Sequence, residues 1–212
     1  AKSVKAKLDK TAKEVSVSFD SDFSSGHLIM MATDLDKATV LRPVFFNKAK
    51  ETKILISTAD ELVAFAQNVN AQEGSQNMDI YLEKDIDISS IKDWTPIGNG
   101  TFSGTAVSGA AFKGTFHGQN HTIKGMNITV PADAAKGASY GLFGVLDGAT
   151  VKDLDIGEGS SITSSAKLLT CGGAIAGSVV NSTVDHCTSS ASFDISGGTN
   201  NISQRFGGIA GS

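Results

Sequence analysis

The chain of 212 residues contains little of what several protein classes require. It has two cysteines, three prolines and one tryptophan, and no apolar run reaches the roughly 18 residues of a membrane-spanning helix. Cys171 and Cys187 are 16 residues apart, which fits no zinc-binding pattern. Two buried thiols are the simplest interpretation, and a disulfide between adjacent turns of a repeat stack is the alternative in an oxidising compartment. The sequence has no phosphate-binding loop, nucleophile elbow or HExxH helix.

Basic residues are scarce over most of the chain. Residues 54–212 hold 8 Lys and Arg against 15 Asp and Glu, a net charge of −7, whereas residues 1–53 have a net charge of +3. An acidic surface argues against nucleic acid as a partner. A lyase needs cationic groups to neutralise an acidic polysaccharide, and the seven lysines and Arg205 of the acidic region are few for that task.

Glycine is abundant, with 23 residues, and it marks a repeat. A short apolar tetrad bounded by small residues occurs three times: Gly-Leu-Phe-Gly at 141–144, Ala-Ile-Ala-Gly at 174–177 and Gly-Ile-Ala-Gly at 208–211. Their closing glycines are 33 and 34 residues apart. A fixed period of this length is typical of solenoids, in which each unit buries its apolar face against its neighbours. We expect the tetrad glycines to adopt positive φ at sharp corners.

A second pattern keeps the same period. Ile-x-x-Met-x-Ile at 123–128 recurs as Val-x-x-Leu-x-Ile at 151–156 and, in degraded form, as Val-x-x-Cys-x-Ser at 184–189. Stacking the turns predicts interior columns, which we list here: Leu142, Ile175 and Ile209 in one, and Val151 and Val184 in another. The loops at 131–139, 157–170 and 196–204 are rich in small and polar residues and fit between the repeats.

The start of the chain differs from the repeats. Residues 1–53 alternate apolar and polar residues and predict a small β region, with strands at 15–19, 27–32 and 39–46 and a turn at 34–37. Pro43 restricts its strand to an edge or a bulge. Residues 58–71 are the one good helix, because Thr58 and Glu61 form a capping box before an apolar stripe. We expect this helix to plug the open end of the strand stack.

The fold class is therefore all-β: a right-handed parallel β-helix-like stack at 54–212, preceded by one capping helix and the small β region at 1–53. Three motifs occur in order: Trp-Thr-Pro-Ile-Gly at 94–98, a Gly-rich run with Gly-Gln-Asn-His-Thr-Ile at 118–123, and the first tetrad. They resemble the repeat region of bacterial surface proteins with the GLUG motif, and residues 56–88 are similar to its leading helix and strand. The later tetrads depart from the motif, with alanine in place of glycine or phenylalanine.

The resemblance implies a β-helix in large secreted or cell-anchored proteins, including adhesin-like proteins of gut Bacteroides-like bacteria. It also implies non-catalytic regions of immunoglobulin A-cleaving proteases. On this basis the leading hypothesis is a non-enzymatic, extracellular repeat module at a bacterial cell surface, held to the outer membrane by regions outside this chain. Its partner would be a glycan or protein of the host or of a neighbouring cell. The alternatives are a polysaccharide lyase or hydrolase on the same scaffold, and an accessory region of a surface protease.

Four residues are candidates for a ligand surface: Trp94, His117, Asp153 and Asp155. Trp94 is either a platform for a sugar ring or a packing residue at a corner of the stack. Asp153 and Asp155 lie two residues apart, as do Asp85 and Asp87, so each pair is expected on one sheet face. Stacked carboxylates would bind Ca²⁺, and solvated outward faces are the simpler interpretation.

The histidines carry weaker expectations. His117 and His121 suit a metal ligand or acid–base role, or an imidazole that bonds the backbone of the turn. His186 follows Asp185 directly, so strand alternation predicts opposite faces and no dyad. We assign no catalytic residue, cofactor or metal ligand. The third tetrad is followed only by Ser212, and we expect a further segment or another chain to cover that turn.

Overall fold

The computed structural model describes residues 4–9, 14–19, 25–33, 39–47, 53–72, 75–104, 106–196 and 204–212. The chain divides into two compact units, Ala1–Thr52 and Lys53–Ser212. The second unit begins at Lys53 because this residue opens strand β5 (Lys53–Ile56), which pairs with β6. Among the described residues, no helix has the length and apolar character needed to cross a membrane.

The first unit contains two antiparallel strand pairs. Its strands are β1 (Val4–Asp9) paired with β2 (Glu14–Phe19), and β3 (Ser25–Thr33) paired with β4 (Thr39–Asn47). The strands predicted at 15–19, 27–32 and 39–46 are therefore confirmed as parts of β2, β3 and β4. Pro43 lies opposite Ile29 in a two-stranded sheet, where every strand is an edge, as predicted. The turn predicted at 34–37 lies outside the described residues.

A single α-helix precedes the solenoid. Helix α1 (Ala59–Asn70) begins after Thr58, whose side chain accepts a hydrogen bond from the Glu61 N–H while the Glu61 carboxylate bonds back to the cap. The predicted capping box is thus present. The apolar stripe is buried, and the Phe65 ring packs edge-on against Phe112 of the first turn, with 5.8 Å between the centroids. A short 3₁₀ helix, η1 (Ser75–Asn77), follows.

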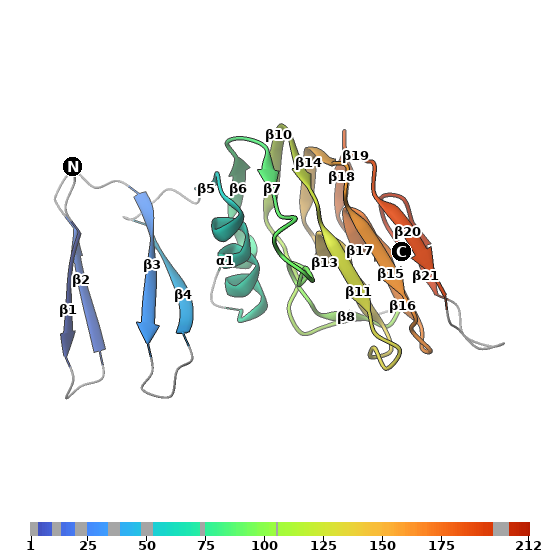
Figure 1. Ribbon diagram of the computed structural model, residues 1–212, viewed down its shortest axis with the longest axis horizontal. Helices are drawn as coiled ribbons and strands as arrows, with labels where there is room; N and C mark the ends of the chain where they lie inside the picture. The colour runs from blue at the N-terminus through green and yellow to red at the C-terminus, as the bar shows by residue number, and fades with distance from the viewer. Residues whose placement is uncertain are drawn as a thin grey trace. The chain divides into compact units, whose positions relative to one another are not determined.

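The rest of the second unit is a β-solenoid of about four turns of parallel strands (Figure 1). Its largest sheet, which we call the wide sheet, has seven strands: β5, β6 (Asp79–Leu82), β7 (Ile86–Asp87), β10 (Thr115–Lys124), β14 (Thr150–Ile156), β18 (Thr183–Asp185) and β19 (Thr188–Ser189). The predicted β-helix-like fold is therefore confirmed.

Three smaller sheets complete the turns. One contains β11 (Asn127–Val130), β15 (Ser161–Ser164) and β20 (Ser192–Ile195). The next contains β8 (Thr101–Phe102), β9 (Val107–Ser108), β12 (Ala138–Tyr140), β16 (Thr170–Gly173) and β21 (Arg205–Gly207). The last contains β13 (Phe143–Asp147) and β17 (Ala176–Val180), and single bridges extend it to Ile97 and Ala210. The β8 and β9 pairings are antiparallel.

Apolar side chains stack in columns inside the solenoid. The wide sheet places five residues in register: Ile54, Ile80, Phe116, Val151 and Val184. The first four are buried and Val184, in the last turn, is half-buried. The pairing of β13, β17 and Ala210 likewise aligns the predicted column of Leu142, Ile175 and Ile209. Both predicted columns are therefore confirmed.

One predicted alignment is wrong. Ile123 lies opposite Ile156, and Val151 lies opposite Phe116, so the triplet that starts at Ile123 does not stack on the one that starts at Val151. Its spacing of 28 residues is shorter than a turn, whereas Phe116 and Val151 are 35 residues apart. The later pair is correct, since Val151 lies opposite Val184 and Ile156 opposite Ser189.

The tetrad glycines have a different role from the one predicted. None of them adopts positive φ. They are needed for close approach instead: a Cβ on Gly141 would lie 2.3 Å from the Gly173 carbonyl oxygen, and one on Gly177 would lie 2.3 Å from the Tyr140 nitrogen. Successive backbones therefore pack without an intervening side chain at these corners.

Candidate functional site

One row of side chains crosses the outer face of the wide sheet, and we call it the axial row. Its members occupy successive strands in register: Leu55, Tyr81, His117, Lys152 and Asp185. Each follows a residue of the buried column by one position, so strand alternation directs it outward. Leu55 is 47% exposed, the next three residues are half-buried, and Asp185 is exposed.

Aromatic stacking organises the centre of the axial row. The Tyr81 and His117 rings lie parallel, with 4.0 Å between centroids and 7° between planes. The ammonium of Lys53 lies 5.3 Å from the Tyr81 centroid, in cation–π contact. Since neighbouring parallel strands are about 4.8 Å apart, two planar side chains in register stack naturally.

The surroundings of His117 favour its neutral form. Partial burial is the largest cause that lowers its pKa, and the positive charge of Lys152 lowers it further. Asp79 and Asp153 act in the opposite direction. A neutral imidazole has one donor and one acceptor nitrogen, so His117 can bond a group that both donates and accepts.

Asp153 lies at an irregularity next to the axial row. Residues 118–120 of β10 stand opposite this single residue of β14, and Asp153 itself has a φ of +53°. A left-handed residue interrupts the alternation of side chains, so the argument that put Asp153 and Asp155 on one face fails here. The negative charge of Asp153 acts on His117 and His186, whereas Asp155 bonds residues of neighbouring strands.

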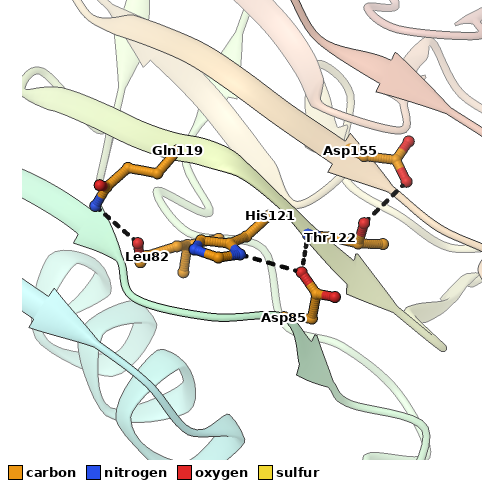
Figure 2. A network of polar contacts seen from close by, with 6 residues as sticks. All are labelled: Leu82, Asp85, Gln119, His121, Thr122 and Asp155. Atoms are coloured by element: carbon orange, nitrogen blue, oxygen red, sulfur yellow. Dashed lines mark hydrogen bonds and ion pairs between the residues drawn. The ribbon is translucent and has the colours of Figure 1, made fainter.

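Asp155 belongs to a ladder of polar contacts that Figure 2 shows in part. Asp85 accepts a hydrogen bond from the Thr122 N–H at 2.9 Å, and its carboxylate lies 3.2 Å from Nδ1 of His121. The Thr122 hydroxyl donates to Asp155 at 3.3 Å, and the Thr188 hydroxyl donates to Asp155 at 2.6 Å. The imidazole of His121 thus contacts a carboxylate rather than the backbone predicted for it.

The ladder holds its carboxylates as acceptors. The Thr122 N–H bond is the largest cause that lowers the pKa of Asp85, and its contacts with His121 lower it further. Asp87 has a lowered pKa because it bonds Ser89, and its carboxylate pairs with Lys124 at 3.4 Å. A glycosidase acid requires a raised pKa, so neither carboxyl group has the environment of a proton donor.

Trp94 does not form a ligand platform. Its side chain is 3% exposed, and its indole N–H donates to the Leu142 carbonyl at 3.1 Å. A sugar ring needs an accessible aromatic face, which this residue lacks. The motif at 94–98 instead joins the helix to the first turn, because the Asn70 amide bonds the Pro96 carbonyl and the Gly98 N–H.

His186 and Asp185 form the close pair that alternation excluded. Nδ1 of His186 lies 2.8 Å from the Asp185 carboxylate. Strand β18 ends at Asp185 and His186 has a φ of +48°, so the side chains turn toward each other. The hydrogen bond with Asp185 is the largest cause that raises the pKa of His186.

Both cysteines are free, Cys171 buried and Cys187 half-buried, so the alternative of a disulfide between them is not realised. Burial raises the pKa of the Cys187 thiol. In the described part of the chain, no group of three or more His, Cys, Asp or Glu side chains is placed to hold a metal ion.

Tyr81, Lys152 and Leu55 were missed in the sequence. The signal was present, because Ile80-Tyr81, Phe116-His117 and Val151-Lys152 each pair an inward residue with an outward polar one. Their spacings of 36 and 35 residues differ from the tetrad period, and the incorrect triplet alignment concealed the match.

Comparison with known proteins adds no further likeness: no family model, no curated protein and no solved structure matches the chain. The resemblance to GLUG-motif repeats thus rests on the three sequence motifs alone.

Proposed function

We propose that the chain is a non-enzymatic binding module of a bacterial surface protein, which adheres to a glycan or protein of the host or of a neighbouring cell. The axial row carries this proposal. It gives the solenoid a continuous line of accessible polar and aromatic side chains over five adjacent strands. A rigid parallel stack holds such a line in fixed geometry, which lowers the ordering cost of binding. The GLUG-like motifs support an extracellular location with an anchor elsewhere in the protein.

A hydrolase on the same scaffold would use the ladder. Asp85 and Asp155 flank Thr122 on neighbouring strands, so their Cα atoms are separated by about two strand spacings, roughly 10 Å. This separation is in the range of inverting glycosidases. The lowered pKa of Asp85 favours the binding module over the hydrolase.

Adhesion and product release, measured on the same preparation, test the proposal. Beads coated with the chain should retain epithelial cells, immobilised matrix proteins or bacterial cells more than beads coated with albumin. The same protein should release no reducing sugar and no unsaturated product from a polysaccharide panel. Sugar release that Asp155→Asn abolishes would establish the hydrolase instead, and failure to retain any of these surfaces would refute adhesion.

A further inference from the structure

Three side chains at the centre of the axial row leave polar groups without a protein partner. Within the described part of the chain, the Tyr81 hydroxyl and the His117 imidazole nitrogens make no hydrogen bond, and the Lys152 ammonium makes no ion pair. By contrast, Lys124 on the same sheet is paired with Asp87, and Lys113 lies 2.9 Å from the Asp147 carboxylate. Hydrogen-bonding capacity is therefore concentrated along one line.

The geometry of the rings limits what the row can recognise. One face of Tyr81 is covered by His117 and the ring also contacts Lys53, so its edge and hydroxyl remain for a ligand. The centre of a protein interface is normally apolar and poor in charged side chains. The axial row offers one exposed apolar side chain, Leu55, at its end. A hydroxyl-rich ligand suits this surface better than a protein does.

The charges of the row and its neighbours are mixed. Lys53 and Lys152 carry positive charge, and Asp79 and Asp185 carry negative charge in register with them. A polyanion would meet two carboxylates along this line, and a polycation two ammonium groups, each at an electrostatic cost. An uncharged chain meets neither penalty. Because each sugar hydroxyl both donates and accepts, it can bond ammonium and carboxylate groups alike.

We propose that the axial row binds an uncharged glycan chain that lies across strands β5 to β18. Four strand spacings separate Leu55 from Asp185, about 19 Å, which is the length of several sugar units. Tyr81, His117 and Lys152 bond the sugar hydroxyls, and Leu55 contacts an apolar ring face. This inference rests on the proposed adhesive function and specifies its ligand and its site.

Affinity electrophoresis of the full chain tests the ligand. The probes are three soluble uncharged polysaccharides (a β-glucan, a galactan and a mannan) and two acidic ones (a polyuronate and a sulfated glycan). We expect at least one uncharged probe to retard the wild-type chain. Tyr81→Phe removes only the hydroxyl and Lys152→Gln only the charge, and each should weaken binding of that probe about tenfold, the value of one good hydrogen bond. Lys124→Gln, already paired with Asp87, should bind like the wild type.

Circular dichroism and urea unfolding of each variant confirm that the fold is retained. Retardation by acidic probes alone, by none of the probes, or equally for wild type and both axial-row variants would overturn the inference. The bead assay separates this failure from failure of the proposed function. Beads that still retain cells through an unchanged Tyr81→Phe chain would keep adhesion and reject the axial row. Loss of binding to a matrix protein in these variants would assign the row to a protein partner instead.

Discussion

The hydroxyl groups of Ser139 and Ser178 lie 2.9 Å apart in the interior of the solenoid, although 39 residues separate them in sequence. Ser139 donates its proton to the Gly137 carbonyl, so Ser178 is the donor in this pair. The Ser178 hydroxyl also lies 3.1 Å from that of Ser212. Three successive turns are therefore joined by buried hydroxyl groups next to columns of apolar side chains.

Replacement of Ser178 by alanine should destabilise the second unit. It leaves Ser139 without its donor and Ser212 without a neighbour, and an unsatisfied buried polar group costs about 1–3 kcal/mol. Urea unfolding measures the change at constant m-value. Ser190→Ala is the matched control, because Ser190 is exposed and should change the free energy of unfolding by less than about 0.5 kcal/mol. Equal stability of the two variants would contradict the structural role of the hydroxyl line.

The first glycines of the first and third tetrads should respond differently to alanine. A Cβ on Gly141 would overlap the Gly173 carbonyl oxygen, whereas one on Gly208 would meet nothing within 4 Å. Because backbone has to move, Gly141→Ala should lower the free energy of unfolding by about 1–3 kcal/mol or more. Gly208→Ala should be neutral or slightly stabilising, since it restricts the unfolded chain. A harmless Gly141→Ala would show that these corners tolerate a side chain.

The repeat could be predicted from the sequence because its period is carried by residues that cannot vary freely. Gly141 and Gly177 occupy places without room for a Cβ, and Leu142 and Ile175 fill the interior between them. These constraints recur at each turn, so a fixed spacing of glycine and apolar residues reveals them. The capping box at Thr58 is equally local, and for that reason the helix start was predictable.

The corners and the site could not be predicted in this way. Asp153 and His186 adopt positive φ without being glycine, and no local pattern announces this. Their conformations decide that Asp185 meets His186 and that Asp153 and Asp155 serve different neighbours. The axial row also depends on strand pairing across irregular spacings, which only the three-dimensional register of the strands supplies.

The contact between helix α1 and the first turn can be measured as a coupling energy. Phe65 and Phe112 are both fully buried and meet edge to face. In a double-mutant cycle of Phe65→Leu and Phe112→Leu, we expect a coupling of about 0.5–1.5 kcal/mol, as for other aromatic pairs. Phe65→Leu combined with Ile162→Val, in a different sheet, should be additive within about 0.5 kcal/mol. Additivity of the two phenylalanine variants would mean that the helix does not pack on the first turn.

The two histidines beside Asp153 should titrate in a defined order. His186 has a raised pKa because of its bond with Asp185, and His117 has a lowered pKa because of burial and Lys152. In a nuclear magnetic resonance titration of the imidazole protons, His186 should therefore change at a higher pH than 6.5 and His117 at a lower one. Signals are assigned with His117→Gln and His186→Gln.

The same shifts predict opposite effects on stability. The raised pKa of His186 contributes stability below pH 6.5 that is lost as the pH rises through its folded value. The lowered pKa of His117 means that the unfolded chain binds more protons below pH 6.5, so stability falls as the pH decreases there. His186→Gln should flatten the profile above pH 6.5 and His117→Gln should flatten it below. Urea unfolding from pH 5 to 8 measures both profiles, and a flattening in the opposite windows would show that the assigned neighbours do not set these pKa values.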